Sequence, residues 1–231
     1  MSEAATVTPG IKAEEKMAPK DTREKILEAA LELFRERGFA QATMREIATR
    51  AGVASGLAYY YFGSKDAIVL AFYQQAKDDL ATALDAAQKD RRLAPRLQAL
   101  IEAKFRYFSP NRGFLGALMS HAADPASPLS PFGEPSRDTR EFDLAHFERA
   151  LTETRTSVPA DLKPHIAKIL WFYQMGLLLF WIYDRSPQQR RSRALLDASL
   201  TIVVLLIKLS NLPLMRPARR SVLNIIAILE S

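Results

Sequence analysis

The sequence predicts an all-α fold. Strong helix formers such as Ala, Leu, Arg and Glu are abundant among the 231 residues, whereas glycine occurs only nine times. Apolar residues recur at helical spacing along most of the chain, and few segments show the alternation of a half-buried strand. A chain of this length can bury a substantial core. We therefore expect helices only, in a small N-terminal group and a larger C-terminal one.

Composition excludes several kinds of chemistry. The chain has no cysteine, which excludes disulfides, thiolate catalysis and zinc-thiolate sites and fits a reducing cytosol. The formal net charge is +6, but residues 20–80 carry nine basic and nine acidic side chains, so the surplus lies beyond residue 80. Such a surplus is typical of ordinary solvated surface, and bulk charge therefore does not indicate where a nucleic acid would bind.

Two segments bear on cellular location. Residues 1–19 are polar and lack the hydrophobic run of a secretory signal, and we expect them to form a disordered N-terminal arm. The most apolar stretch, from Ile169 to Tyr183, is shorter than the roughly 20 residues that cross a bilayer. It is expected to be a buried helix, and the protein is expected to be cytoplasmic with no membrane partner.

The first two helices have clear end signals. Asp21 opens a capping-box pattern, an apolar stripe of helical spacing follows, and Gly38 can take the left-handed conformation that ends a helix. Thr43 and Glu46 repeat the capping box at the start of a second, short helix. Gly52 then makes the turn.

A third helix is predicted from Ala54 or Ser55 to Phe62. At 100° per residue, one side of this helix is buried and holds Ala54, Ala58, Tyr61 and Phe62. Gly56, Leu57, Tyr59 and Tyr60 point elsewhere. Exposure of three large side chains on so small a helix is poorly explained by solvation alone, and indicates a binding surface.

The rest of the chain is predicted to be helical with one long break. Ser64 caps a fourth helix, Lys65 to Lys89, which links the two halves. Residues 124–136 contain four prolines in thirteen residues, and no helix can cross them. Helices are expected over 95–108, 137–154, 159–184, 187–210 and 216–229, and 111–121 is expected to be partly helical.

The pattern of the second and third helices resembles the DNA-binding domain of the TetR family of transcriptional regulators. The matching residues are Thr43-x-x-Glu-Ile-Ala48, Ala51-Gly52-Val53, Gly56, Ala58-Tyr59-Tyr60-Tyr61-Phe62 and Ser64-Lys65, preceded by Ile-Leu-x-Ala-Ala-Leu-x-Leu-Phe-x-x-x-Gly-Phe from Ile26 to Phe39. The resemblance implies a three-helix helix-turn-helix domain over 20–80, with its motif at 43–62. It also implies a linking helix and a larger C-terminal helical domain, 81–231, for effector binding and dimerisation.

What the resemblance implies for DNA is a homodimer whose two recognition helices enter successive major grooves of a two-fold symmetric double-stranded operator. The helix carrying Arg45 and the helix from Ser55 to Tyr60 would face the DNA, and Lys65 would meet a phosphate. The candidate DNA-binding residues are Thr43, Arg45, Ser55, Gly56, Leu57, Tyr59, Tyr60 and Lys65.

Chemistry assigns separate roles within this set. Thr43, Lys65 and the hydroxyls of Tyr59 and Tyr60 are donors for phosphate oxygens, which position the protein without reading sequence. Arg45 can reach a guanine edge, Ser55 can donate or accept at a base, Leu57 suits a thymine methyl, and Gly56 allows close approach. Many family members have Ser in place of Ala54 and Thr in place of Leu57. Ser55 therefore either caps its helix or reads a base.

The C-terminal half is implied to hold an effector pocket and the dimer interface. Aromatic and soft side chains with a few polar groups suit a small hydrophobic ligand, and the candidates are Phe105, Phe108, Met119, His121, Trp171, Gln174 and Met175. The alternative is that they are ordinary core. The helices around 159–184 and 187–210 are apolar on more than one face, which favours them as the dimer interface. No separate role is assigned to 213–231.

The resulting hypothesis is a sequence-specific DNA-binding regulator, and specifically a repressor that a small hydrophobic ligand releases from its operator. An enzyme is disfavoured because the three histidines lie far apart and no phosphate loop or nucleophile elbow is present. No cofactor and no metal are expected. Two alternatives stay open, a non-specific architectural DNA-binding protein and a helical interaction protein with a degenerate helix-turn-helix.

Overall fold

The computed structural model describes residues 19–122, 124 and 126–230, and within them it contains helices and no strand. The all-α prediction is confirmed. The predicted arm, 1–19, lies outside the described residues except for Pro19. The helices are α1 (Pro19–Arg37), α2 (Met44–Arg50), α3 (Ser55–Tyr61), α4 (Lys65–Ala87), α5 (Leu93–Phe108), α6 (Arg112–Ala122), α7 (Arg137–Glu153), α8 (Ile166–Tyr183), α9 (Arg190–Leu209) and α10 (Arg216–Glu230), with short 3-10 turns at Ser109–Asn111, Glu134–Ser136, Pro187–Gln189 and Pro213–Met215.

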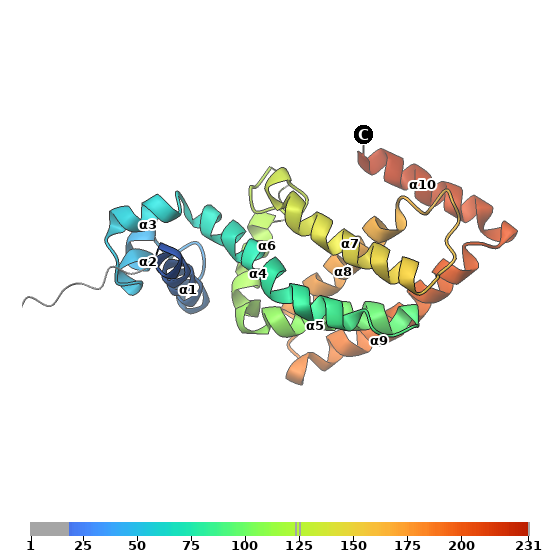
Figure 1. The fold of residues 1–231 in the computed structure, drawn as a ribbon, viewed down its shortest axis with the longest axis horizontal. Coiled ribbons are helices and arrows are strands. Elements are labelled where there is room, and N and C mark those ends of the chain that lie inside the picture. Colours follow the sequence, from blue (N-terminus) through green and yellow to red (C-terminus); the bar gives the residue numbers. More distant parts are fainter. Residues whose placement is uncertain (1–18, 123, 125, 231) are drawn as a thin grey trace, which may run out of the picture.

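The helices form two groups joined by α4. Figure 1 shows α1, α2 and α3 packed together at one end, α4 running from them into a larger body of α5 to α9, and α10 at the far end. Helix α4 continues through residue 80 to Ala87. The predicted division at residue 80 therefore falls inside a helix, and the domain limits stay a prediction.

The core of the N-terminal group includes part of the C-terminal half. Ile26, Phe34 and Ile47 are buried there, as expected from their helical spacing. Phe114 and Leu118 of α6 belong to the same buried cluster, and the ring of Phe114 stacks on that of Phe34 with centroids 5.1 Å apart. Helix α6 is thus shared between the two groups.

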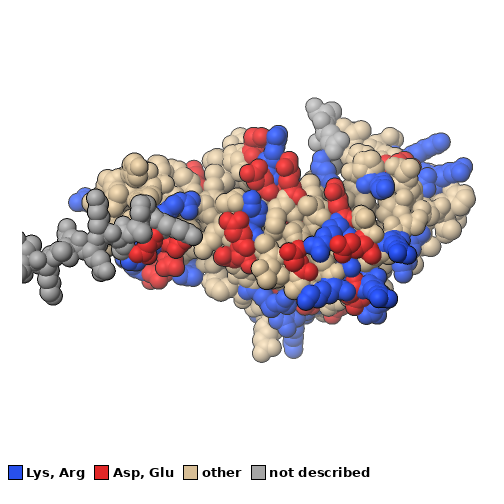
Figure 2. Space-filling view, viewed as in Figure 1, with Lys and Arg blue, Asp and Glu red and all other residues tan. Residues whose placement is uncertain are grey.

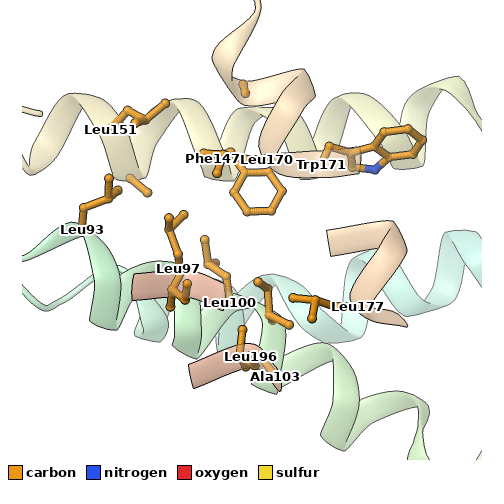
Figure 3. Packing of buried hydrophobic residues seen from close by; sticks show 14 of the residues in the cluster. Leu93, Leu97, Leu100, Ala103, Phe147, Leu151, Leu170, Trp171, Leu177 and Leu196 are labelled. Carbon is orange, nitrogen blue, oxygen red and sulfur yellow. The ribbon is translucent and has the colours of Figure 1, made fainter. Parts of the chain in front are cut away.

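The second core lies between α5, α7, α8 and α9. Figure 3 shows its buried side chains, in which leucines of α5 meet Phe147 and Leu151 of α7, Leu170 and Trp171 of α8, and Leu196 of α9. This cluster joins α5, α7, α8 and α9, and Tyr107 and Phe108 of α5 pack against both cores.

Helix α8 is only half buried. Its length and mean hydropathy would allow it to cross a membrane, as would the pair Pro187–Leu209 and Pro213–Ile228, which is bent by 106°. The core helix of a soluble protein passes the same test, and Leu170, Trp171 and Leu177 of α8 lie in the second core. Its opposite face is exposed, so the prediction of a buried helix is right for one face only.

Two predicted helix starts are wrong. Helix α1 begins at Pro19 rather than at an Asp21 cap, and Asp21 sits inside the first turn with its carboxylate 3.4 Å from the Lys25 ammonium. Helix α8 begins at Ile166 rather than Pro159, because the intervening residues fold into tight turns such as Lys163 N–H to Pro159 O at 2.9 Å. The Thr43 cap of α2, the Ser64 cap of α4 and the helix after the proline-rich break are confirmed.

Candidate nucleic-acid interface and ligand cavity

The turn between α2 and α3 is fixed by backbone and capping bonds. Glu46 N–H donates to Thr43 Oγ1 at 3.2 Å, and Thr43 N–H donates back to Glu46 Oε2 at 2.9 Å. The hydrogen bonds that the Thr43 hydroxyl and the Thr43 backbone N–H donate to the Glu46 carboxylate hold the pKa of that carboxyl below its ordinary value. Gly52 has φ +69°, a left-handed conformation that favours glycine, and Val53 N–H closes the turn on Ala48 O at 3.0 Å. These bonds together fix the orientation of α3 relative to α2.

Helix α3 buries one side and presents large side chains on the other. Ala58 is fully buried and Phe62, which follows the helix, is almost so. By contrast Leu57 is 39% exposed, Tyr59 54% and Tyr60 81%. The exposed leucine and two tyrosines give this helix of seven residues an amphipathic contact surface.

Gly56 and Ser55 are likewise unused by the fold. A Cβ added at Gly56 would meet nothing within 4 Å, so no neighbour in the described chain requires a glycine there. Ala54 occupies the N-cap position and makes no side-chain cap bond, while Ser55 is the first helical residue. Ser55 therefore does not take over the cap. Its hydroxyl remains available, which favours the base-reading alternative.

Arg45 differs from the other arginines around α2. Arg50 is held by Glu36 at 2.7 Å and Glu32 at 3.4 Å, and Arg37 by Glu46 at 2.8 Å. The hydrogen bond from Arg50 also lowers the pKa of the Glu36 carboxyl. The Arg45 side chain is exposed and its guanidinium pairs with no carboxylate of the described residues. Acidic and basic side chains are intermingled over much of the face in Figure 2, so a single unpaired arginine matters more than net charge.

Lys65 and Thr43 both make contacts within the fold, and of these only the Thr43 cap was predicted from the sequence. The Lys65 ammonium donates to Phe39 O at 2.7 Å and Ala40 O at 3.3 Å, and lies 4.7 Å from the centre of the Phe39 ring. These contacts tie the start of α4 to the end of the α1 segment. The Thr43 hydroxyl donates to Glu46 Oε2 at 2.9 Å. A phosphate would be an additional partner for either residue, and that role stays a prediction.

A cavity of about 150 Å³ lies in the C-terminal half between α4, α5, α6, α7 and α8. Four of the predicted pocket residues line it, namely Phe108, Met119, Trp171 and Met175. Tyr73 of α4 also lines it, and burial raises the pKa of its hydroxyl to about 12, so the phenol stays neutral. The cavity thus touches the helix that links the two groups.

The other predicted pocket residues lie elsewhere. The Phe105 ring stacks on Trp181 with centroids 5.2 Å apart and faces a different cleft. Gln174 is 1% exposed and donates to Asp143 Oδ2 at 3.1 Å, behind the cavity wall. The side chain of His121 lies outside the described part of the chain.

Sequence reasoning missed the polar wall of the cavity, which consists of Lys104, Ser136, Thr139, Arg140 and Asp143. Lys104 and Asp143 are both buried and form a direct ion pair. Residues 136, 139, 140 and 143 recur at three- and four-residue spacing, so they share one face of the turn and helix that they occupy. That spacing, in a helix with no strong apolar stripe, is the signal that could have revealed the wall.

Comparison with known proteins gives the identity of both halves. Residues 26–72 match the family model "Bacterial regulatory proteins, tetR family", and residues 96–222 match "Tetracyclin repressor-like, C-terminal domain". The HTH-type transcriptional regulator BetI of Rhizobium meliloti is 38% identical over 88 residues, which are 36% of this chain and 42% of BetI. The chain thus matches less than half the length of this relative.

Solved structures extend the likeness over most of the chain. Salmonella enterica GusR gives a TM-score of 0.64 at 21% identity, covering 84% of this chain and all of that one. FadR from Bacillus subtilis, in complex with stearoyl-CoA, gives 0.62 at 18% identity, covering 78% of this chain and 97% of that one. These likenesses show the fold. Because the C-terminal family model alone spans more than half of the sequence, the chain belongs to the TetR family of DNA-binding transcriptional regulators.

Proposed function

We propose that the protein is a homodimeric, cytoplasmic repressor that binds a two-fold symmetric operator and is released by a small, largely apolar ligand. The DNA contacts are made by Arg45 and by the exposed face of α3, from Ser55 to Tyr60. Thr43 and Lys65 meet phosphates at the edges of this surface. Without ligand, the dimer holds two copies of α3 at the spacing of successive major grooves.

The observation that carries the proposal is the position of α6. Leu118 of α6 lines the cavity and is also buried in the N-terminal core. Phe114, one turn earlier, stacks on Phe34 of α1. Arg35 of α1 donates to Asn111 Oδ1 at 3.3 Å, directly before α6. A ligand that moves α6 must therefore shift α1 and the DNA-reading helices packed on it, because close-packed side chains transmit displacement.

The size of this effect is set by linkage. A ligand changes operator affinity only as far as it binds the two arrangements of α6 differently, with coupling typically of about 1 to 3 kcal/mol. The apolar walls of the cavity, formed by residues such as Leu115, Leu178 and Ile182, favour an apolar ligand body. The stearoyl-CoA bound to the related FadR is consistent with such a ligand.

A second copy of the chain is expected on the exposed faces of α8 and α9. Phe172, Leu179 and Phe180 are exposed on α8, and Ile202, Leu205 and Leu206 on α9. Each set recurs at helical spacing and so forms one apolar row. Two adjacent helices with apolar rows facing solvent are typical of an isologous dimer interface.

The test is a fluorescence-anisotropy titration of the protein against the duplex upstream of its own gene and against scrambled DNA, at two salt concentrations. We expect preference for the specific duplex by about a thousandfold. Tyr60→Ala should reduce that preference. Arg91→Ala, which removes an exposed arginine from the segment between α4 and α5, is the control and should bind normally.

Other results would reject the proposal. Equal and steeply salt-dependent binding to both duplexes would instead support the architectural reading. A repressor also requires that transcription in vitro from the same promoter fall when the protein is added and recover when ligand is added. An increase in transcription when the protein is added would make it an activator rather than the proposed repressor.

A further inference from the structure

The cavity between α4 and α8 has walls of two kinds. Apolar side chains of α6 and α8 form most of its surface. The polar groups lie mainly along one wall, where Ser136, Thr139, Arg140 and Asp143 follow one another at helical spacing. A cavity with one polar wall and otherwise apolar walls is complementary to an amphiphile, whose apolar body and polar head lie on opposite sides.

The polar groups of this wall are unequally satisfied. Asp143 is compensated by the Lys104 ammonium and by Gln174 Nε2, which donates at 3.1 Å. Ser136 Oγ is buried and has no hydrogen-bond partner among the described residues. A buried polar group without a partner is destabilising and rare in native proteins, so it points to a partner that is absent from the free chain.

Arg140 adds an uncompensated charge. Its Nη1 donates to Pro131 O at 2.8 Å and Gly133 O at 3.1 Å, both neutral carbonyls. No described carboxylate pairs with the guanidinium, whose Nε and Nη2 donors remain unengaged. With Lys104 and Asp143 cancelling each other, the wall carries one net positive charge, on a guanidinium that can only donate hydrogen bonds.

From this inventory we infer that the ligand is a monocarboxylate with a compact apolar body, its carboxylate accepting hydrogen bonds from Ser136 and Arg140. The inference rests on the proposed function and specifies its ligand class. A carboxylate matches planar guanidinium donors and neutralises the single charge. A cationic head would meet Arg140 unfavourably, because Asp143, the acid among the described residues that line the cavity, is already paired with Lys104. A neutral alcohol would satisfy Ser136 but not the charge.

The dimensions limit the apolar body. An apolar cavity of about 150 Å³ accommodates a ring-sized molecule. Met119 and Met175 line the cavity and, being unbranched and flexible, can move to admit a somewhat longer chain. We therefore expect medium-chain or aryl carboxylates to enter the cavity without displacing a helix from the second core.

Three probes of equal chain length isolate the head group. Octanoate, 1-octanol and octylamine, kept below their aggregation limits, are titrated into the full chain by isothermal calorimetry. We expect octanoate to bind about tenfold or more tightly than octylamine, with 1-octanol between them. Equal affinities, tightest binding of octylamine, or no binding of octanoate would overturn the inference.

Variants then locate the head group. Arg140→Gln should abolish the preference for octanoate, whereas Arg137→Gln, which removes an exposed arginine paired with Glu134 at 2.9 Å, should leave it within about twofold. Ser136→Ala should lower octanoate affinity by about two- to tenfold. Because Ser136 Oγ bonds to none of the described residues, this variant should fold normally even if Arg140→Gln disturbs the loop. A preference that survives both substitutions would overturn the assignment.

A second measurement separates this inference from the proposed function. Each probe is added to the preformed operator complex and anisotropy is followed. If octanoate binds in calorimetry but leaves the operator complex intact, the inferred ligand class stands and the proposed ligand-gated release is contradicted. If 1-octanol or octylamine binds at least as tightly as octanoate and releases the operator, ligand-gated release stands and the inferred ligand class is overturned.

Discussion

The proposed DNA-binding face on α3 and the proposed ligand cavity are marked by opposite kinds of evidence. On α3 the informative residues are exposed and make no contact that the fold requires, as Tyr60 and Gly56 illustrate. In the cavity the informative residues are buried or partly buried polar groups, namely Ser136 Oγ, which has no hydrogen-bond partner among the described residues, and Arg140, which pairs with no described carboxylate. A surface site is therefore recognised by side chains that the fold does not need, and an interior site by polar groups that it fails to satisfy.

The largest effect is expected at the proposed dimer face, because this face is exposed in one chain and buried in the proposed pair. Ile202→Glu would bury two carboxylates per dimer, at a cost of at least about 5 kcal/mol, and should yield monomers in sedimentation experiments. Thr201→Glu, about 100° around α9, should change the dimer much less. A dimer that persists in Ile202→Glu would place the interface on another surface.

The buried ion pair comes next in expected size. Lys104→Met leaves Asp143 charged and buried with only Gln174 beside it, so the free energy of unfolding should fall by about 3 to 5 kcal/mol. Lys104→Met/Asp143→Leu removes both charges and should recover most of that loss. Urea denaturation measures both. A single variant as stable as the parent would show that the pair is solvated in solution.

How far the sequence could predict the molecule follows from the range of the signals involved. Helix α2 and the turn after it depend on Thr43, Glu46 and Gly52, which act within a few residues, and they were predicted correctly. Family membership confirms that the chain is a regulator and not an enzyme. The predicted start of α8 was wrong because the residues that follow Pro159 form turns rather than a helix.

The cavity needed information that is not local. Ser136 and Lys104 are brought together only by the packing of α5 against α7, and neither was among the predicted pocket residues. Aromatic type alone selected Phe105 as well as Phe108, although only Phe108 lines the cavity. Tertiary packing decided which of two similar side chains faces the space.

Two arginines of α2 test the DNA-facing surface by direct comparison. Arg45 is unpaired, so Arg45→Ala should weaken operator binding by about 1 to 3 kcal/mol and relax preference at one base pair. Arg50 is held by Glu36 and Glu32, so Arg50→Ala should affect operator affinity less. Anisotropy titrations against the operator and single-base variants of it distinguish the two. Equal losses would mean that bulk charge, rather than a free guanidinium, governs binding.

The smallest effect is expected from adding one methyl group to α3, which should change stability and DNA binding in opposite directions. Gly56→Ala adds a methyl group that meets nothing within 4 Å in the free protein, and alanine favours helix over glycine by roughly 0.5 to 1 kcal/mol. The variant should therefore unfold at a slightly higher urea concentration. Operator affinity should nevertheless fall, because the methyl group occupies the surface against which a DNA backbone would pack. Unchanged affinity would show that DNA does not approach α3 at this residue, and reduced stability would show that the free helix differs from the one described here.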